Sequence, residues 1–186
     1  GQPTILPEGF YSSKTLVDKA IEYIASEEDT DKPFFTYIAF QAVHIPVQAP
    51  AEFRDKYLNH YTQGWSVLRE QRSQGLVASG VLKELAPSYI APTTVPWDSL
   101  DPQVQAFESK GMAVYAGMVD AMDHHIGRLV DYIDSQGKLD NTVFIFLSDN
   151  GAEGSLATRS PSGDPGLQNL PMRSWMYFND FNTDLE

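Results

Sequence analysis

The sequence predicts an α/β fold in which helices flank part of a mainly parallel β-sheet. Two apolar runs support this prediction: residues 34–40 (Phe-Phe-Thr-Tyr-Ile-Ala-Phe) and residues 143–147 (Val-Phe-Ile-Phe-Leu). Apolar sequence that is continuous rather than alternating is typical of strands buried on both faces. A helical pattern precedes each run, and a helix followed by a buried strand is half of a βαβ unit.

Composition narrows the classes of function. The chain has 186 residues, of which 13 are Lys or Arg and 25 are Asp or Glu, for a net charge of −12. This acidity argues against nucleic acid as a partner and against docking to an anionic membrane. The chain has no cysteine, which excludes disulfides, thiolate catalysis and zinc–thiolate sites within it. No apolar run is long enough for a membrane span.

The two helices are predicted from apolar spacing. Val17, Ala20, Ile21 and Ile24 form one apolar face, with Ser12 or Ser13 as a plausible N-cap. A longer helix is expected over residues 104–135 and should end at Gly137. Its apolar positions are Tyr115, Met118, Val119, Met122, Ile126, Leu129, Val130 and Ile133.

Residues 50–104 read as a loop-rich excursion over the strand ends, within a single partial domain that comprises residues 1–186. Prolines dominate its second half, and only residues 61–74 suggest a helix, which Gly75 and Gly80 would end. Trp97 is expected to anchor this excursion rather than to contact a ligand.

Polar residues follow both predicted strands, at the edge of the sheet where α/β proteins bind ligands. Asp149 and Asn150 offer two oxygen ligands of the kind that Ca²⁺ or Mg²⁺ prefers. The alternative is that Asn150-Gly151 is only a tight turn, because both residues tolerate positive φ. His44 follows the first strand, where a catalytic and a structural role are both open. The adjacent His124 and His125 diverge around the helix, so a solvated helix face is favoured over a metal site.

The order and spacing of several motifs resemble the type I sulfatases, the arylsulfatases of the alkaline phosphatase superfamily. The motifs are residues 33–46 followed by Gln48-Ala49-Pro50, then residues 115–123 with Ile126-Gly127-Arg128, then Leu139-Asp140-Asn141-Thr142, and finally residues 148–154 (Ser-Asp-Asn-Gly-Ala-Glu-Gly). Any one of them is weak, whereas the combination is specific and spans most of the chain.

The resemblance implies hydrolysis of a sulfuric ester, either a small sulfate ester or a sulfated glycan. It implies that Asp149 and Asn150 bind the active-site Ca²⁺, with Mg²⁺ as the alternative metal. It also implies that His44 contacts the sulfate and assists the leaving group. A periplasmic or secreted location follows from the resemblance alone.

The chain departs from the family pattern in its nucleophile and in its extent. The family makes a formylglycine from a Cys or Ser in a Cys/Ser-x-Pro-x-Arg motif, and no such motif is present. The paired aspartates that complete the metal site are also missing, so the chain resembles an internal fragment whose sheet is incomplete at both ends. We therefore expect the isolated chain to be inactive, and either to self-associate or to bind a complementing segment. A phosphate or phosphonate ester hydrolase of the same superfamily, and a non-catalytic fragment, are the competing hypotheses.

Overall fold

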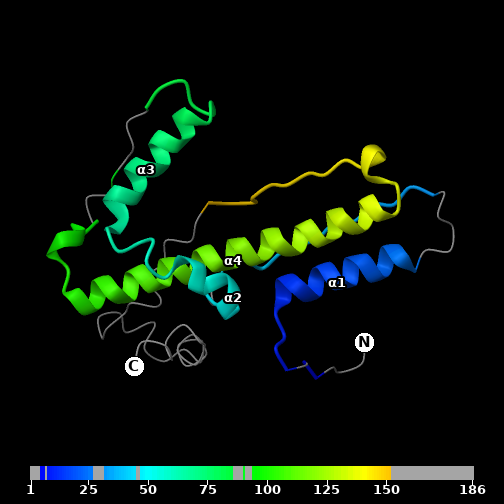
Figure 1. Cartoon of the computed structure of the whole chain (residues 1–186), viewed down its shortest axis with the longest axis horizontal. Helices are drawn as coiled ribbons and strands as arrows, with labels where there is room; N and C mark the ends of the chain where they lie inside the picture. Colours follow the sequence, from blue (N-terminus) through cyan, green and yellow to red (C-terminus); the bar gives the residue numbers. More distant parts are fainter. Residues whose placement is uncertain are drawn as a thin grey trace.

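A long central helix organises the computed structural model, which describes residues 5–6, 8–26, 32–44, 47–85, 90 and 94–151. Figure 1 shows this helix, α4, with α1 alongside one half of it, α2 near its middle and α3 rising from the other end. The described elements are α1 (Ser12–Ala25), α2 (Ala51–Arg54), the 3₁₀ turn η1 (Asp55–Tyr57), α3 (Gly64–Ala78), η2 (Trp97–Ser99), α4 (Pro102–Ser135) and η3 (Leu139–Asn141).

The predicted helix near the N-terminus is confirmed as α1, and it packs on the C-terminal half of α4. Val17 of α1 is buried against Leu129 and Ile133 of α4. The expected serine N-cap is wrong: Tyr11 occupies that position without a side-chain cap, and both serines lie inside the helix. Ser13 is almost fully buried, so packing rather than capping accounts for its place.

A charged network also joins α1 to α4. Asp18 accepts hydrogen bonds from Lys14 and from Arg128, each at 2.6 Å. Partial burial raises the pKa of Asp18, but the two hydrogen bonds and the charges of Lys14 and Arg128 outweigh this and lower it. The Asp18 side chain is about one-third exposed, so solvent limits the contribution of the network to about 1 kcal/mol or less.

The long helix is also confirmed, and local sequence explains both of its ends. Asp101 caps α4 by accepting a hydrogen bond from the Gln103 N–H at 2.8 Å, and Pro102 fits the first turn because it needs no donor there. Beyond Ser135, Gly137 adopts a φ of 67°, which favours glycine. The Lys138 N–H then returns to the Ile133 carbonyl at 3.2 Å, so the helix stops where the sequence indicates.

The buried face of α4 only partly follows the predicted stripe. Met118, Leu129 and Ile133 are buried as expected, whereas Val119 is exposed. The rest of the buried face consists of small residues and one histidine: Ser109, Ala113, Gly117, Ala121 and His125, together with Val114. At Gly117 the close crossing of α2 over α4 requires the small residue, because a Cβ atom there would lie 2.8 Å from the Arg54 Cα.

Residues 50–104 contain more helix than the sequence indicates. Four helical elements (α2, η1, α3 and η2) lie there, and Gly75 lies inside α3 rather than ending it. Gly80, with a φ of 76°, follows the end of α3 as predicted. Trp97 is buried edge-to-face against Trp65 at 5.0 Å between ring centroids, which agrees with its expected anchoring role.

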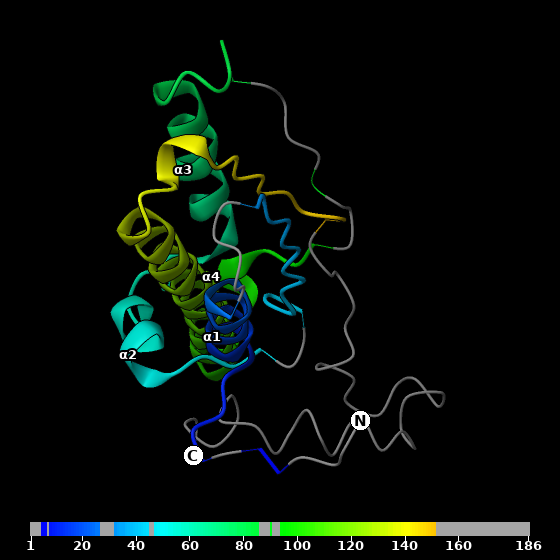
Figure 2. The same ribbon diagram turned by 90° about the vertical axis from the view of Figure 1, so that its right-hand side faces the viewer.

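The two predicted strands are extended in the structure, but the sheet is not present among the described residues. Neither residues 34–40 nor residues 143–147 pair with another described segment. In Figure 2 both extended segments lie to the right of the helices, on the side away from α2. The expectation of strands buried on both faces is not confirmed among the described residues: Ile38 and Phe40 pack on the α1–α4 core, but most of the other apolar side chains of these segments are exposed. Burial of the second face needs sheet neighbours or a further layer, and no described residue provides them.

No helix in the described part of the chain is long and apolar enough to cross a membrane.

Candidate functional site

His44 lies in a turn that packs against α4. The Ala42 and Val43 side chains before it, and Val47 after it, pack against Val114 and Met118 of α4. The His44 N–H donates to the Gln41 carbonyl at 2.8 Å, which closes the turn, and the His44 side chain is exposed. The apolar residues on either side thus fix the backbone of the turn that carries the His44 side chain.

Asp149 and Asn150 follow the second extended segment, which begins at η3. The Thr142 hydroxyl donates to the Lys138 carbonyl at 2.8 Å and starts the segment, which then runs back along α4 in Figure 1. At its far end, the Ser148 hydroxyl donates to the Asn150 carbonyl at 2.6 Å. Asn150 Nδ2 donates to the Gly151 carbonyl at 2.7 Å, so its Oδ1 is the atom left to accept or to bind a cation.

The alternative explanation of this motif as a turn is supported in part. Residues 148–151 do bend and close on themselves through these two hydrogen bonds. Gly151, however, is not among the glycines with positive φ, so this residue does not use the left-handed conformation that the alternative invoked for it.

The described residues do not gather a complete metal site. Asp149 and Asn150 supply two oxygen ligands, whereas Ca²⁺ takes six to eight. Across the described ranges, no three His, Asp or Glu side chains cluster in a way that could hold a metal ion. The chemistry of Asp149 and Asn150 fits a hard cation, and their number does not complete its coordination shell.

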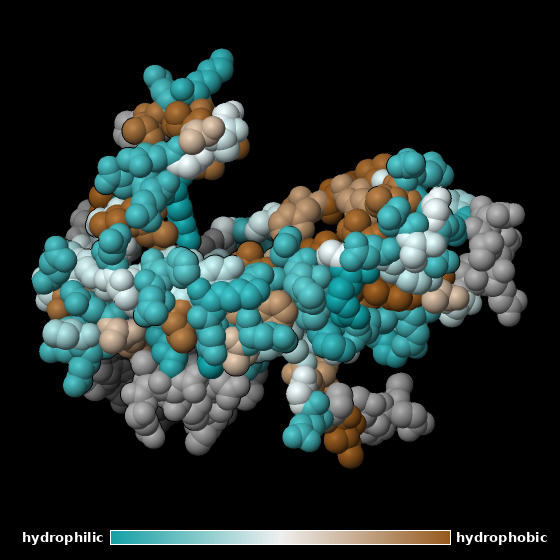
Figure 3. Space-filling view, viewed as in Figure 1, coloured by the Kyte–Doolittle hydropathy of each residue, from teal (hydrophilic) through white to brown (hydrophobic). Residues whose placement is uncertain are grey.

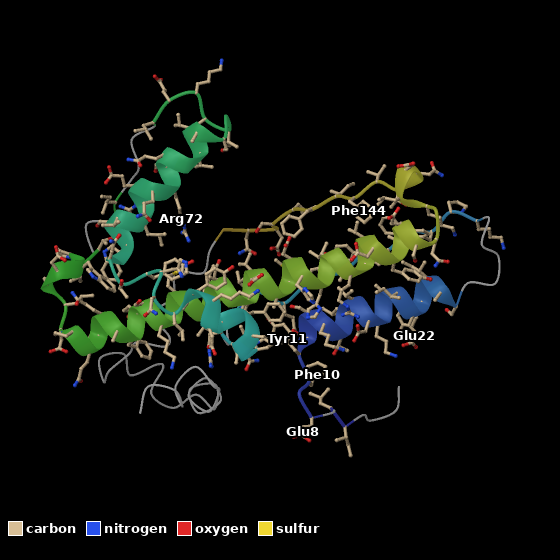
Figure 4. All side chains as sticks on the ribbon, viewed as in Figure 1. Glu8, Phe10, Tyr11, Glu22, Arg72 and Phe144 are labelled. Carbon is tan, nitrogen blue, oxygen red and sulfur yellow. The ribbon has the colours of Figure 1, made fainter. Side chains whose placement is uncertain are left out.

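A cluster of polar and aromatic side chains that the sequence did not predict lies where α1, α2 and α4 meet. The three elements enclose a recess of about 310 Å³, lined by Gly9, Tyr11, Lys14, Pro50, Glu52, Phe53, His124, His125 and Arg128. Figure 4 labels Tyr11 at the start of α1, where the chain enters this junction. His124 is exposed as expected on a solvated face, but His125 is buried and its ring lies 6.0 Å from that of Phe53.

The neighbours of His125 determine its protonation state. Arg128 donates to His125 Nδ1 at 3.2 Å, and since a guanidinium can only donate, Nδ1 accepts and the ring proton lies on Nε2. Burial, the Arg128 charge and the adjacent His124 all lower the pKa of His125 below its ordinary value of 6.5. The buried ring is therefore neutral at pH 7. Hydrophobic periodicity could not predict the burial of His125, because histidine does not belong to the apolar pattern.

This lowered pKa makes the stability of the chain depend on pH. Because the unfolded chain binds the proton on His125 more readily than the folded chain, the free energy of unfolding should be highest above pH 6.5 and fall below it. Each unit by which folding lowers this pKa corresponds to about 1.4 kcal/mol. Urea unfolding at a series of pH values should show this loss in the wild type and a smaller loss in His125→Asn, whose Oδ1 can still accept from Arg128. An unchanged pH profile in the variant would contradict this origin of the effect.

The family model and the relatives found by comparison with known proteins agree on one family. The family model described as Sulfatase matches residues 2–172. An uncharacterized sulfatase of Schizosaccharomyces pombe is 40% identical over 174 residues, which cover 88% of this chain and 31% of that protein. An arylsulfatase of Klebsiella aerogenes is 34% identical over 152 residues, with coverages of 82% and 32%. An arylsulfatase of Clostridium perfringens is 24% identical over 152 residues, with coverages of 77% and 27%. The chain thus spans about a third of the length of these relatives.

Proposed function

Because the chain belongs to the sulfatase family, we propose that the complete protein hydrolyses sulfuric esters through a site to which this chain contributes His44, Asp149 and Asn150. The similarity to arylsulfatases over most of the chain supports this proposal. So does the placement of all three polar residues just after the two extended apolar segments. The substrate class that we propose is a small sulfate ester or a sulfated glycan, and the proposed location is periplasmic or extracellular.

The proposed roles follow from the chemistry of each side chain. Asp149 and Asn150 Oδ1 are hard oxygen donors that would hold Ca²⁺, or Mg²⁺ as the alternative, and such a cation neutralises sulfate charge. His44 is exposed on an anchored turn, so its imidazole can donate a hydrogen bond or a proton to a sulfate-ester oxygen. The isolated chain carries no cysteine and no Ser-x-Pro-x-Arg sequence from which the formylglycine nucleophile of the family could be made. We propose that by itself it does not turn over sulfate esters.

Calorimetric titration with Ca²⁺ tests the metal role directly on this chain. With two protein ligands we expect weak binding, with a Kd on the order of 10⁻³ M. The double variant Asp149→Ala/Asn150→Ala should lose the binding signal. A matched control is Asp140→Ala/Asn141→Ala, which removes the same pair of residue types from η3 and should retain the signal. An absence of binding in the wild type, or equal loss in both variants, would overturn the assignment of these ligands.

The catalytic role is tested in the complete protein with aryl sulfate and aryl phosphate substrates. His44→Ala should lower kcat for the sulfate ester by about 10²–10⁴-fold, the usual contribution of a general acid or base. Faster turnover of the phosphate ester would favour the phosphoesterase alternative. Wild-type turnover of the sulfate ester by His44→Ala would exclude His44 from the reaction.

A further inference from the structure

Two buried side chains of α4 pack against the turn that carries His44. Val114 is 2% exposed and Met118 is 4% exposed, and their spacing of four residues places them on one face of the helix. Figure 3 shows mostly hydrophilic, teal side chains along the middle of the molecule, where α4 runs, so these two apolar side chains lie beneath that surface. The partly buried side chains that pack on them come from the turn and its flanks: Ala42, Val43 and Val47.

His44 lies outside the helices, so its position depends on how this turn is anchored. The His44 N–H donates to the Gln41 carbonyl at 2.8 Å, and this bond sets the local shape of the turn. It does not place the turn relative to the rest of the chain, whereas the contacts with Val114 and Met118 do. A side chain that acts on a substrate must be held within about 0.5 Å of its working position, which requires packing by its neighbours.

The chain after the turn is fixed to the same stretch of α4. Ala49 belongs to the same buried cluster, and a Cβ atom at Gly117 would lie 3.2 Å from the Ala49 Cβ. Just after α2, Lys56 donates to Asp120 of α4 at 2.8 Å. The turn is thus attached to α4 both through its own side chains and through the segment that follows it.

We propose that Val114 and Met118 are positioning residues: their packing against the turn fixes where the His44 imidazole lies. The inference rests on the role proposed for His44 in the hydrolysis of a sulfate ester. Both side chains are buried and act on the reaction only through His44. A misplacement on the order of 1 Å at a reacting group can cost about 10²-fold in rate, so a change in this packing should be visible in turnover.

Amide hydrogen exchange of this chain tests the anchoring without any enzymatic activity. Val114→Ala removes two buried carbon atoms from beneath the turn, and the His44 N–H should then exchange about tenfold faster. Val17→Ala is the matched control: Val17 is 0% exposed, and its cluster in the α1–α4 core contains no residue of the turn. There we expect exchange of the His44 N–H to stay within about twofold of the wild type. An unchanged rate in Val114→Ala, or an equal rise in both variants, would overturn the proposal.

Met118 provides a second test that separates packing from the identity of the side chain. Met118→Ala should also speed exchange of the His44 N–H, because it leaves a gap beneath the turn. Met118→Leu nearly conserves the volume and should stay close to the wild type. Equal exchange in the two variants would show that the turn does not depend on this contact.

Turnover of an aryl sulfate by the complete protein tests the consequence for the reaction. Val114→Ala should lower kcat by about 10–10²-fold, whereas Val17→Ala should keep it within about twofold of the wild type. In the His44→Ala background, adding Val114→Ala should cause no further loss, because a positioning residue has no effect once the group that it positions is gone. A further loss as large as that in the wild-type background would show general structural damage instead.

The two kinds of measurement distinguish failure of this inference from failure of the proposed function. If His44→Ala is impaired while Val114→Ala keeps the wild-type kcat, the role of His44 stands and the positioning role fails. If His44→Ala keeps full turnover, the proposed role of His44 fails. Faster exchange in Val114→Ala would then describe only the anchoring of a structural turn.

Discussion

Replacing Gly117 by alanine should destabilise the chain, although alanine is the better helix former. Alanine in a helix interior is favoured over glycine by about 1 kcal/mol. At Gly117, however, the added Cβ would lie 2.8 Å from the Arg54 Cα, 2.9 Å from the Arg54 N and 3.2 Å from the Ala49 Cβ. The first two are backbone atoms that cannot rotate away. They could move only if α2 shifted as a unit, and the buried side chain of Phe53 holds α2 in place.

We expect a net loss of about 1–3 kcal/mol in the free energy of unfolding of Gly117→Ala, the usual cost of an overpacked contact. Gly127→Ala is the matched control in the same helix, because nothing lies within 4 Å of a Cβ at that position. It should stabilise the chain by about 0.5–1 kcal/mol through helix propensity alone. Urea unfolding followed by circular dichroism measures both values. Shifts of the same sign in the two variants would show that α2 does not press on Gly117.

Local sequence was sufficient to predict the helices α1 and α4, but not which of their faces would be buried. The spacing of Val17 and Ile21, and of Leu129 and Ile133, identified α1 and α4 because these contacts repeat with the period of the helix itself. His125 is buried because Tyr11, at the start of α1, and Phe53 of α2 lie against its ring. These contacts come from residues distant in sequence, and no periodicity in α4 reveals them.

For the strands and the candidate site too, the sequence predicted the positions along the chain but not the contacts between distant segments. It located both extended segments, and it located His44, Asp149 and Asn150 just after them. Sheet pairing, in contrast, needs partners that no described residue provides, so the extended segments stay unpaired. A coordination shell likewise needs convergent ligands from several segments, and the two oxygen donors at residues 149 and 150 do not gather a third in the described ranges.

The contact between Gly64 and Trp97 is a further feature that only the folded chain shows, and it predicts the largest loss of stability. Gly64 starts α3 with a φ of 83°, a conformation that costs an L-residue with a side chain about 1–2 kcal/mol. A Cβ at this position would lie 2.2 Å from Trp97 Cγ and 2.3 Å from Trp97 Cδ2. The indole would have to leave its buried place against Trp65, so we expect Gly64→Ala to cost about 3–5 kcal/mol, comparable to loss of a buried aromatic side chain.

Gly80→Ala separates the two causes of this loss. Gly80 has a similar φ of 76°, but nothing lies within 4 Å of a Cβ there, so its variant carries the backbone strain without the collision. We expect Gly80→Ala to lose only about 1–2 kcal/mol. Tryptophan fluorescence should shift toward that of exposed indole in Gly64→Ala and stay unchanged in Gly80→Ala, because only the first variant displaces Trp97 from Trp65. Equal losses of stability with unchanged fluorescence in both variants would mean that backbone strain alone limits Gly64, and that the tryptophan pair is free to adjust.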